Sequence, residues 1–143
     1  LERWRSKNFN VSEIGGTMPE SYSKFEVADD PGMSNVSGTS LKGTVKTSYA
    51  ELEEVFGEPT IGPDDRGGDK TTCEWHIEFQ VPVEDDGMGD IDDYDIVVAT
   101  IYDWKNRETP MHRTTWHIGG KEREAEYLVS DVLAGNKNFR KVD

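Results

Sequence analysis

The residues that could most readily do chemistry are carboxylates that lie close together near the middle of the chain. Between positions 82 and 95 the sequence holds seven acidic residues and no basic residue: Glu84, Asp85, Asp86, Asp90, Asp92, Asp93 and Asp95. Calcium takes about six to eight oxygen ligands in a flexible loop, and this composition offers enough of them. The spacing, however, lacks the Asp-x-Asp-x-Asp-Gly order of such loops and their closing glutamate. We therefore predict a solvated hairpin loop without a metal ion.

The net charge suggests a different role for these carboxylates. The chain carries 29 Asp and Glu against 16 Lys and Arg, a formal charge of −13. The excess lies in two acidic blocks, residues 51–69 and 82–95, and the first block includes Asp64 and Asp65. Closely spaced carboxylates imitate the phosphates of a nucleic acid and attract a basic partner over about 10 Å. We therefore predict that the two blocks bind a basic protein surface, such as that of a nucleic-acid-binding protein.

The same charge excludes two classes of partner. Nucleic acids and anionic membrane surfaces bind proteins through Lys and Arg, so direct binding to either is not expected. A general contribution to solubility is the alternative explanation of the acidic blocks. No stretch reaches the ~20 apolar residues of a membrane-spanning helix. The single cysteine, Cys73, fits a reducing cytoplasm.

A second candidate site consists of aromatic and basic residues in the C-terminal half. The aromatic members are Trp75, Tyr102, Trp104 and Trp116, with His117 beside them, and the nearby basic residues are Lys70, Lys105, Arg107, Arg113 and Lys121. Aromatic rings stack on a nucleobase, and Lys or Arg side chains bind its phosphates. This pattern predicts a nucleotide-binding site, as the alternative to a site for a protein partner. The competing interpretation places the aromatic residues in the core.

The sequence offers few pairs of nucleophile and base. Cys73 and His76 lie three residues apart on one predicted strand and therefore on opposite faces of it. His117 approaches Tyr102 or Asp103 if the last two predicted strands pair, which makes it a candidate base. No oxyanion site or phosphate-binding loop accompanies it. We therefore predict a non-enzymatic protein with no catalytic residues and no cofactor.

The elements that must position these residues follow from hydrophobic periodicity. Alternation predicts strands over 40–47, 70–81, 96–104 and 114–118, and helical spacing predicts helices over 49–56 and 121–134. The first helix begins with a capping box of Ser48 and Glu51 and ends at Gly57. This order predicts an α+β fold, an antiparallel sheet of about four strands with two helices packed on one face. Residues 1–39 are predicted to form an irregular N-terminal extension, and 40–143 a single domain with an acidic insertion at 82–95.

Six motifs spread over residues 41–133 carry a resemblance to known sequences. They are Leu41-Lys42-Gly43 with Val45, Tyr49 with Leu52, Phe56-Gly57-Glu58-Pro59, Lys70-Thr71 with Glu74-Trp75, Ala99-Thr100-Ile101-Tyr102-Asp103-Trp104-Lys105, and Trp116-His117-Ile118-Gly119-Gly120. Together they resemble a family of small, mostly uncharacterised proteins encoded by tailed bacteriophages. The resemblance implies a viral protein in the cytoplasm of an infected host cell, and it implies no activity or site residues. The N-terminal extension and the acidic insertion depart from the family's pattern.

Charge and resemblance together favour one functional hypothesis. In it, the chain is a phage-encoded, non-enzymatic acidic binding protein that inhibits a host defence or nucleic-acid enzyme by mimicking nucleic acid. The alternative hypothesis is a protein that sequesters a nucleotide signal. The carboxylates of the acidic blocks carry the first hypothesis, whereas Trp104 and His117 carry the second.

Overall fold

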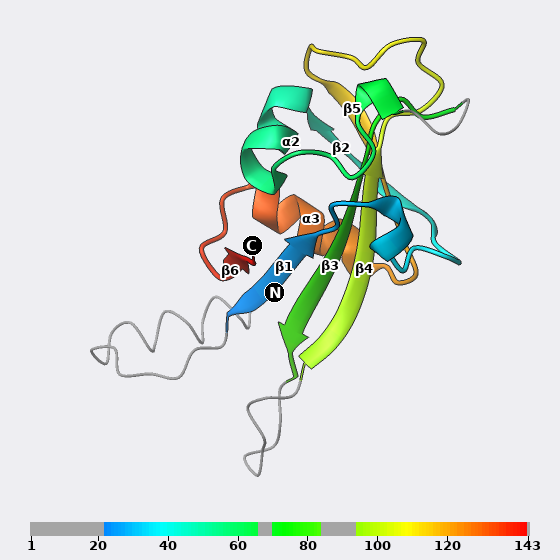
Figure 1. Cartoon of the computed structure of the whole chain (residues 1–143). Coiled ribbons are helices and arrows are strands. Elements are labelled where there is room, and N and C mark those ends of the chain that lie inside the picture. The colour runs from blue at the N-terminus through cyan, green and yellow to red at the C-terminus, as the bar shows by residue number, and fades with distance from the viewer. Residues whose placement is uncertain (1–21, 66–69, 84–93, 143) are drawn as a thin grey trace.

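The computed structural model describes residues 22–65, 70–83 and 94–142, and Figure 1 shows their arrangement. Ten elements follow one another in these ranges: β1 (Ser23–Val27), η1 (Pro31–Met33), β2 (Ser40–Thr47), α2 (Tyr49–Phe56), η2 (Pro63–Asp65), β3 (Glu74–Pro82), β4 (Tyr94–Tyr102), β5 (Thr114–Gly120), α3 (Glu124–Leu133) and β6 (Phe139–Lys141). The elements η1 and η2 are short 3-10 helices. The α+β class predicted from the sequence is confirmed.

The strands form one sheet in the order β2-β5-β4-β3-β1-β6. Its pairs are antiparallel except for β1 and β6, which run parallel, so the sheet is mixed. The prediction of about four antiparallel strands is therefore wrong in number and in part of the pairing. The two additional strands have five and three residues, too short for alternation to stand out from the flanking sequence.

Strand β1 lies within the segment for which an irregular extension was expected. Ser23, Phe25 and Val27 alternate with two charged residues, and Phe25 is buried in the core. Its ring meets Phe56 of α2 edge to face, with the ring centroids 5.5 Å apart. The extension therefore contributes a strand to the same sheet as the rest of the chain, and the prediction of irregular structure is wrong for these residues.

Helix α2 begins and ends at the predicted residues. The Ser48 hydroxyl accepts a hydrogen bond from the Glu51 amide, and the Glu51 carboxylate accepts one from the Ser48 amide, which completes the capping box. Gly57 ends the helix with φ of 84°, a conformation that glycine adopts without a Cβ clash. Leu52 and Phe56 are consequently held on the side of the helix that faces the sheet.

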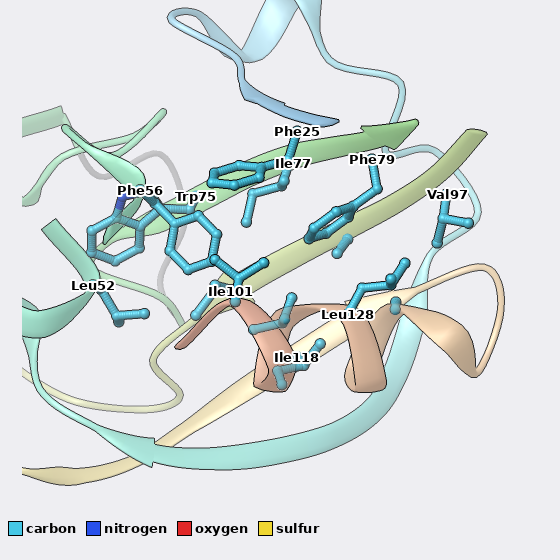
Figure 2. Packing of buried hydrophobic residues seen from close by; sticks show 14 of the residues in the cluster. Phe25, Leu52, Phe56, Trp75, Ile77, Phe79, Val97, Ile101, Ile118 and Leu128 are labelled. Atoms are coloured by element: carbon cyan, nitrogen blue, oxygen red, sulfur yellow. The ribbon is translucent and has the colours of Figure 1, made fainter. Parts of the chain in front are cut away.

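Both α-helices cover one face of the sheet, as predicted, and the core lies between them and the strands (Figures 1 and 2). Strand β3 contributes Trp75, Ile77 and Phe79 to this core, all of them at most 1% exposed. Strand β4 is interior to the sheet, which explains why it is apolar on both faces. Among the described residues, no helix is long and apolar enough to cross a membrane.

Candidate functional site

The candidate site lies on the face of the sheet opposite the helices, called here the outer face. Side chains alternate between faces along a strand, so Glu74, His76 and Glu78 of β3 point away from the core. The segment 28–39, which contains η1, crosses this face (Figure 1). His76 is only 5% exposed beneath it. The outer face therefore combines polar side chains with partial cover from solvent.

Three aromatic side chains, called here the aromatic cluster, meet at one end of the outer face. Tyr102 and His117 are register partners on β4 and β5, with their rings 5.6 Å apart between centroids. The Trp104 ring lies 6.1 Å from each of them. Trp104 is 42% exposed, so its ring remains available for a flat ligand.

Trp116 does not join the aromatic cluster. It precedes His117 on β5 and therefore points to the opposite face, where it is fully buried against Trp75 with 5.8 Å between ring centroids. The expectation that Trp75 and Trp116 contact a ligand is corrected by this placement. Trp116 belongs to the core.

Two lysines accompany the exposed tryptophan. The ammonium groups of Lys70 and Lys105 lie 5.7 and 5.9 Å from the centre of the Trp104 ring, within the range of cation–π attraction. The Lys105 amide donates a hydrogen bond to the Lys70 carbonyl over 2.7 Å, which ties the two segments together. Arg113, another predicted phosphate ligand, instead pairs with Glu51 at 2.6 Å.

Asp103 is a buried residue that stabilises the backbone around Lys70, Trp104 and Lys105. Its carboxylate, in a residue only 1% exposed, accepts hydrogen bonds from the amide and hydroxyl of Thr72, the amide of Cys73 and the side chain of Asn106. These bonds join the segment after Lys70 to the segment after β4. Asp103 therefore holds the backbone that carries Lys70, Trp104 and Lys105, and it does not orient His117.

A hollow of about 250 Å³ adjoins the aromatic cluster. It lies between residues 36–40 and strands β3, β4 and β5, and its lining includes Thr71, Glu74, His76, Thr100, Tyr102 and Trp104. Gly119 lines the hollow and packs closely on β4, because a Cβ there would lie 2.5 Å from the Thr100 hydroxyl. The hollow thus has an aromatic wall and several hydrogen-bonding groups.

Glu74 supplies the charge within the hollow. Its two oxygens accept hydrogen bonds from His76 Nε2 and the Thr71 hydroxyl, each over 2.7 Å. The bond from His76, helped by that from Thr71, lowers the pKa of Glu74, so the group is ionised at neutral pH. Burial, with a smaller effect of the Glu74 charge, raises the pKa of Tyr102, which keeps its hydroxyl protonated.

Comparison with known proteins adds no identification. No protein-family model matches the chain, and neither a curated protein nor a solved structure matches it.

The acidic blocks are described only in part. Glu84, Asp85, Asp86, Asp90, Asp92 and Asp93 lie outside the described residues, as do residues 66–69 of the first block. Asp64 lies in η2. This element is near the start of β3, because Ile61, which precedes η2, forms a β-bridge with Glu74. Asp95 pairs with Val81 at the other end of β3. Because β3 has nine residues, these ends are separated by roughly 26 Å.

The described members of the two acidic blocks therefore do not share one end of the sheet (Figure 1). Asp64 and Asp95 are both exposed, and Asp65 is the last residue of η2. Within the described ranges, no group of three or more His, Cys, Asp or Glu side chains has the geometry to hold a metal ion.

The alternation predicted over residues 70–81 implies that Glu74 and His76 share one face of a strand, and the structure confirms this, but it did not single out Glu74 as part of a site. The spacing Glu74-x-His76 was the available indication, since residues two apart on a strand share a face. Ser34, which also contacts His76, lies 42 residues away in sequence and left no local indication.

Proposed function

We propose that the protein binds a small ligand of the nucleotide class at the aromatic cluster and the adjoining hollow. The observation that carries this proposal is the placement of two ammonium groups beside a half-exposed tryptophan that is packed against Tyr102 and His117. A flat base with an attached anion matches both features. In this proposal the base stacks on Trp104, and Lys70 and Lys105 meet the phosphate.

The size of the hollow limits how the ligand lies. Pockets that enclose whole drug-sized ligands have volumes of about 300–1,000 Å³, and the hollow has about 250 Å³. We therefore expect only the base to enter it, with the sugar and phosphate outside near the two lysines. Glu74 then accepts hydrogen bonds from N–H groups of the base, because a carboxylate has about four lone-pair sites and two are in use.

A biological role follows if the resemblance to phage proteins reflects descent. We propose that such a protein sequesters a nucleotide signal in the cytoplasm of the infected host cell. Inhibition of a host enzyme by nucleic acid mimicry has weaker support, because Asp64 and Asp95 lie at opposite ends of the sheet. The net charge of −13 remains the observation in its favour.

Isothermal titration calorimetry with purine and pyrimidine nucleotides, linear and cyclic, tests the proposal. We expect Trp104→Ala to weaken binding by about 5- to 150-fold, since one base–aromatic stack contributes about 1–3 kcal/mol. Tyr127→Ala is the matched control, because Tyr127 is an aromatic residue of similar exposure on helix α3. No nucleotide binding at millimolar concentration, or equal binding by both variants, contradicts the proposal.

A double variant separates the two parts of the ligand. Replacing Lys70 and Lys105 by Gln is expected to weaken the binding of a nucleotide while leaving the binding of the corresponding nucleoside nearly unchanged. Equal losses for nucleotide and nucleoside would show that the lysines do not act on the phosphate.

A further inference from the structure

A chain of three side chains crosses the outer face beside the aromatic cluster. His76 Nδ1 lies 2.9 Å from the Ser34 hydroxyl, and His76 Nε2 lies 2.7 Å from Glu74 Oε1. Ser34 and Glu74 come from different parts of the chain, one following η1 and the other opening β3. His76 between them is only 5% exposed. The order hydroxyl, imidazole, carboxylate is the order that activates a serine nucleophile.

The hydrogen-bond partners determine the tautomer of neutral His76. Glu74 is ionised at neutral pH and so only accepts hydrogen bonds, which requires the ring proton on Nε2. Nδ1 then carries a lone pair and faces the Ser34 hydroxyl, which must donate its hydrogen. The serine proton already points at the base that would remove it.

Ser34 also borders space for a substrate. A second hollow of about 240 Å³ lies on the other side of His76, and Ser34 is half-buried in its lining. Val27, Ala28 and Val98 form its apolar wall, and Glu26, Asp29 and Glu78 give its lining negative charge. Asn35, the next residue after Ser34, lines the same hollow and carries an amide that can donate to an oxyanion.

From this geometry we propose that Ser34, His76 and Glu74 form a hydrolytic triad for esters. The substrate class has a short apolar acyl group, which fits the hollow, and a neutral or positively charged alcohol, because the acidic lining repels anions. The activity goes beyond the proposed nucleotide binding and uses the hollow on the opposite side of His76.

The reaction proceeds in two balanced steps. Ser34 Oγ attacks the ester carbonyl while its proton passes to His76 Nδ1, and the departing alcohol takes that proton as the C–O bond breaks. The acyl group is now an ester of Ser34. Water then attacks this ester with His76 accepting its proton, the carboxylic acid leaves, and the proton returns to Ser34 Oγ. Glu74 stabilises the imidazolium formed in each step.

The test uses an uncharged fluorophosphonate ester, which forms a stable bond to activated serines, followed by mass spectrometry of the intact chain and its peptides. We expect one label per chain, on Ser34. His76→Asn should slow the labelling at least about 100-fold, in line with the contribution of a general base. Glu74→Gln, which preserves the size of the side chain, should slow it as well and covers the case in which the His76 variant does not fold.

Two comparisons make the result decisive. Ser37→Ala changes an exposed serine of the same segment and is expected to leave labelling unchanged. Hydrolysis of p-nitrophenyl acetate should be lost with Ser34→Ala and retained with Ser37→Ala. Absence of a label on Ser34, or labelling at the same rate in the Glu74→Gln and wild-type proteins, would overturn the triad. Neither outcome depends on nucleotide binding, so the two proposals fail separately.

Discussion

The two faces of β3 show different relations between sequence and structure. On the helix side, Trp75, Ile77 and Phe79 are buried apolar side chains. On the outer face, Glu74 and His76 make directional hydrogen bonds to each other and to residues brought from elsewhere. Burial of apolar surface needs no particular partner, whereas each hydrogen bond needs one donor and one acceptor in the right place. The helix side therefore provides stability, and the outer face carries the candidate site.

The strongest test of this comparison removes the largest buried side chain of β3. Trp75 packs against Tyr49 and Trp116, and its indole nitrogen donates to the Gly57 carbonyl over 2.8 Å. Trp75→Ala is expected to lower the free energy of unfolding by about 3–5 kcal/mol, as for other buried aromatic residues. Urea denaturation measures this loss.

Trp104→Ala is the matched change on the outer face and should alter stability far less, because Trp104 is half-exposed. If both tryptophan variants lost the same stability, the division of roles between the two faces would be wrong.

Asp103 allows a sharper test of the comparison between the two faces, since it is buried but holds segments that belong to the outer face. Asp103→Asn keeps the size of the side chain but weakens the hydrogen bonds from Thr72. It also places a side-chain amide opposite the side-chain amide of Asn106, which now donates to the carboxylate. We expect a loss of about 1.5–3 kcal/mol, typical of hydrogen bonds to a charged group. Thermal unfolding with calorimetry measures it.

Nucleotide affinity of the same variant should also fall, because the segments with Lys70 and Trp104 lose their common support. A variant as stable as the wild type would show that these bonds do not hold the site together.

The smallest expected effect concerns the pH dependence of stability through Glu74. Its pKa is lowered in the folded protein, so the group stabilises the fold above its unfolded pKa of about 4.3. This contribution is lost as the pH falls through the folded value. The difference in unfolding free energy between wild type and Glu74→Gln should therefore shrink between pH 6 and pH 3. A difference that stays constant over this range would contradict the role of the ionised carboxylate.

Local periodicity was sufficient for most of the fold. The capping box of Ser48 and Glu51 defined α2, and alternation assigned residues 74–81 of β3 to the correct face, although the predicted strand began earlier, at residue 70. The strands β1 and β6 were missed because each is too short to show a period. They exist because β1 pairs with β3 and β6 pairs with β1. A strand of three residues is stable only when its partners are already in place.

The candidate site likewise contains residues that the sequence predicted and residues that it did not. Tyr102, Trp104 and His117 were predicted together with Trp116, but the pleat of β5 sends Trp116 into the core. The contact of Ser34 with His76 had no counterpart in the sequence pattern.

By itself the sequence determined on which face of its helix or strand each residue lies, because that depends only on the local helical or strand repeat. Only the tertiary structure decided which segments lie next to each other, including the passage of residues 28–39 over His76. Such pairings bring together residues far apart in the chain, and they are stabilised by the packing of the whole core rather than by any local pattern.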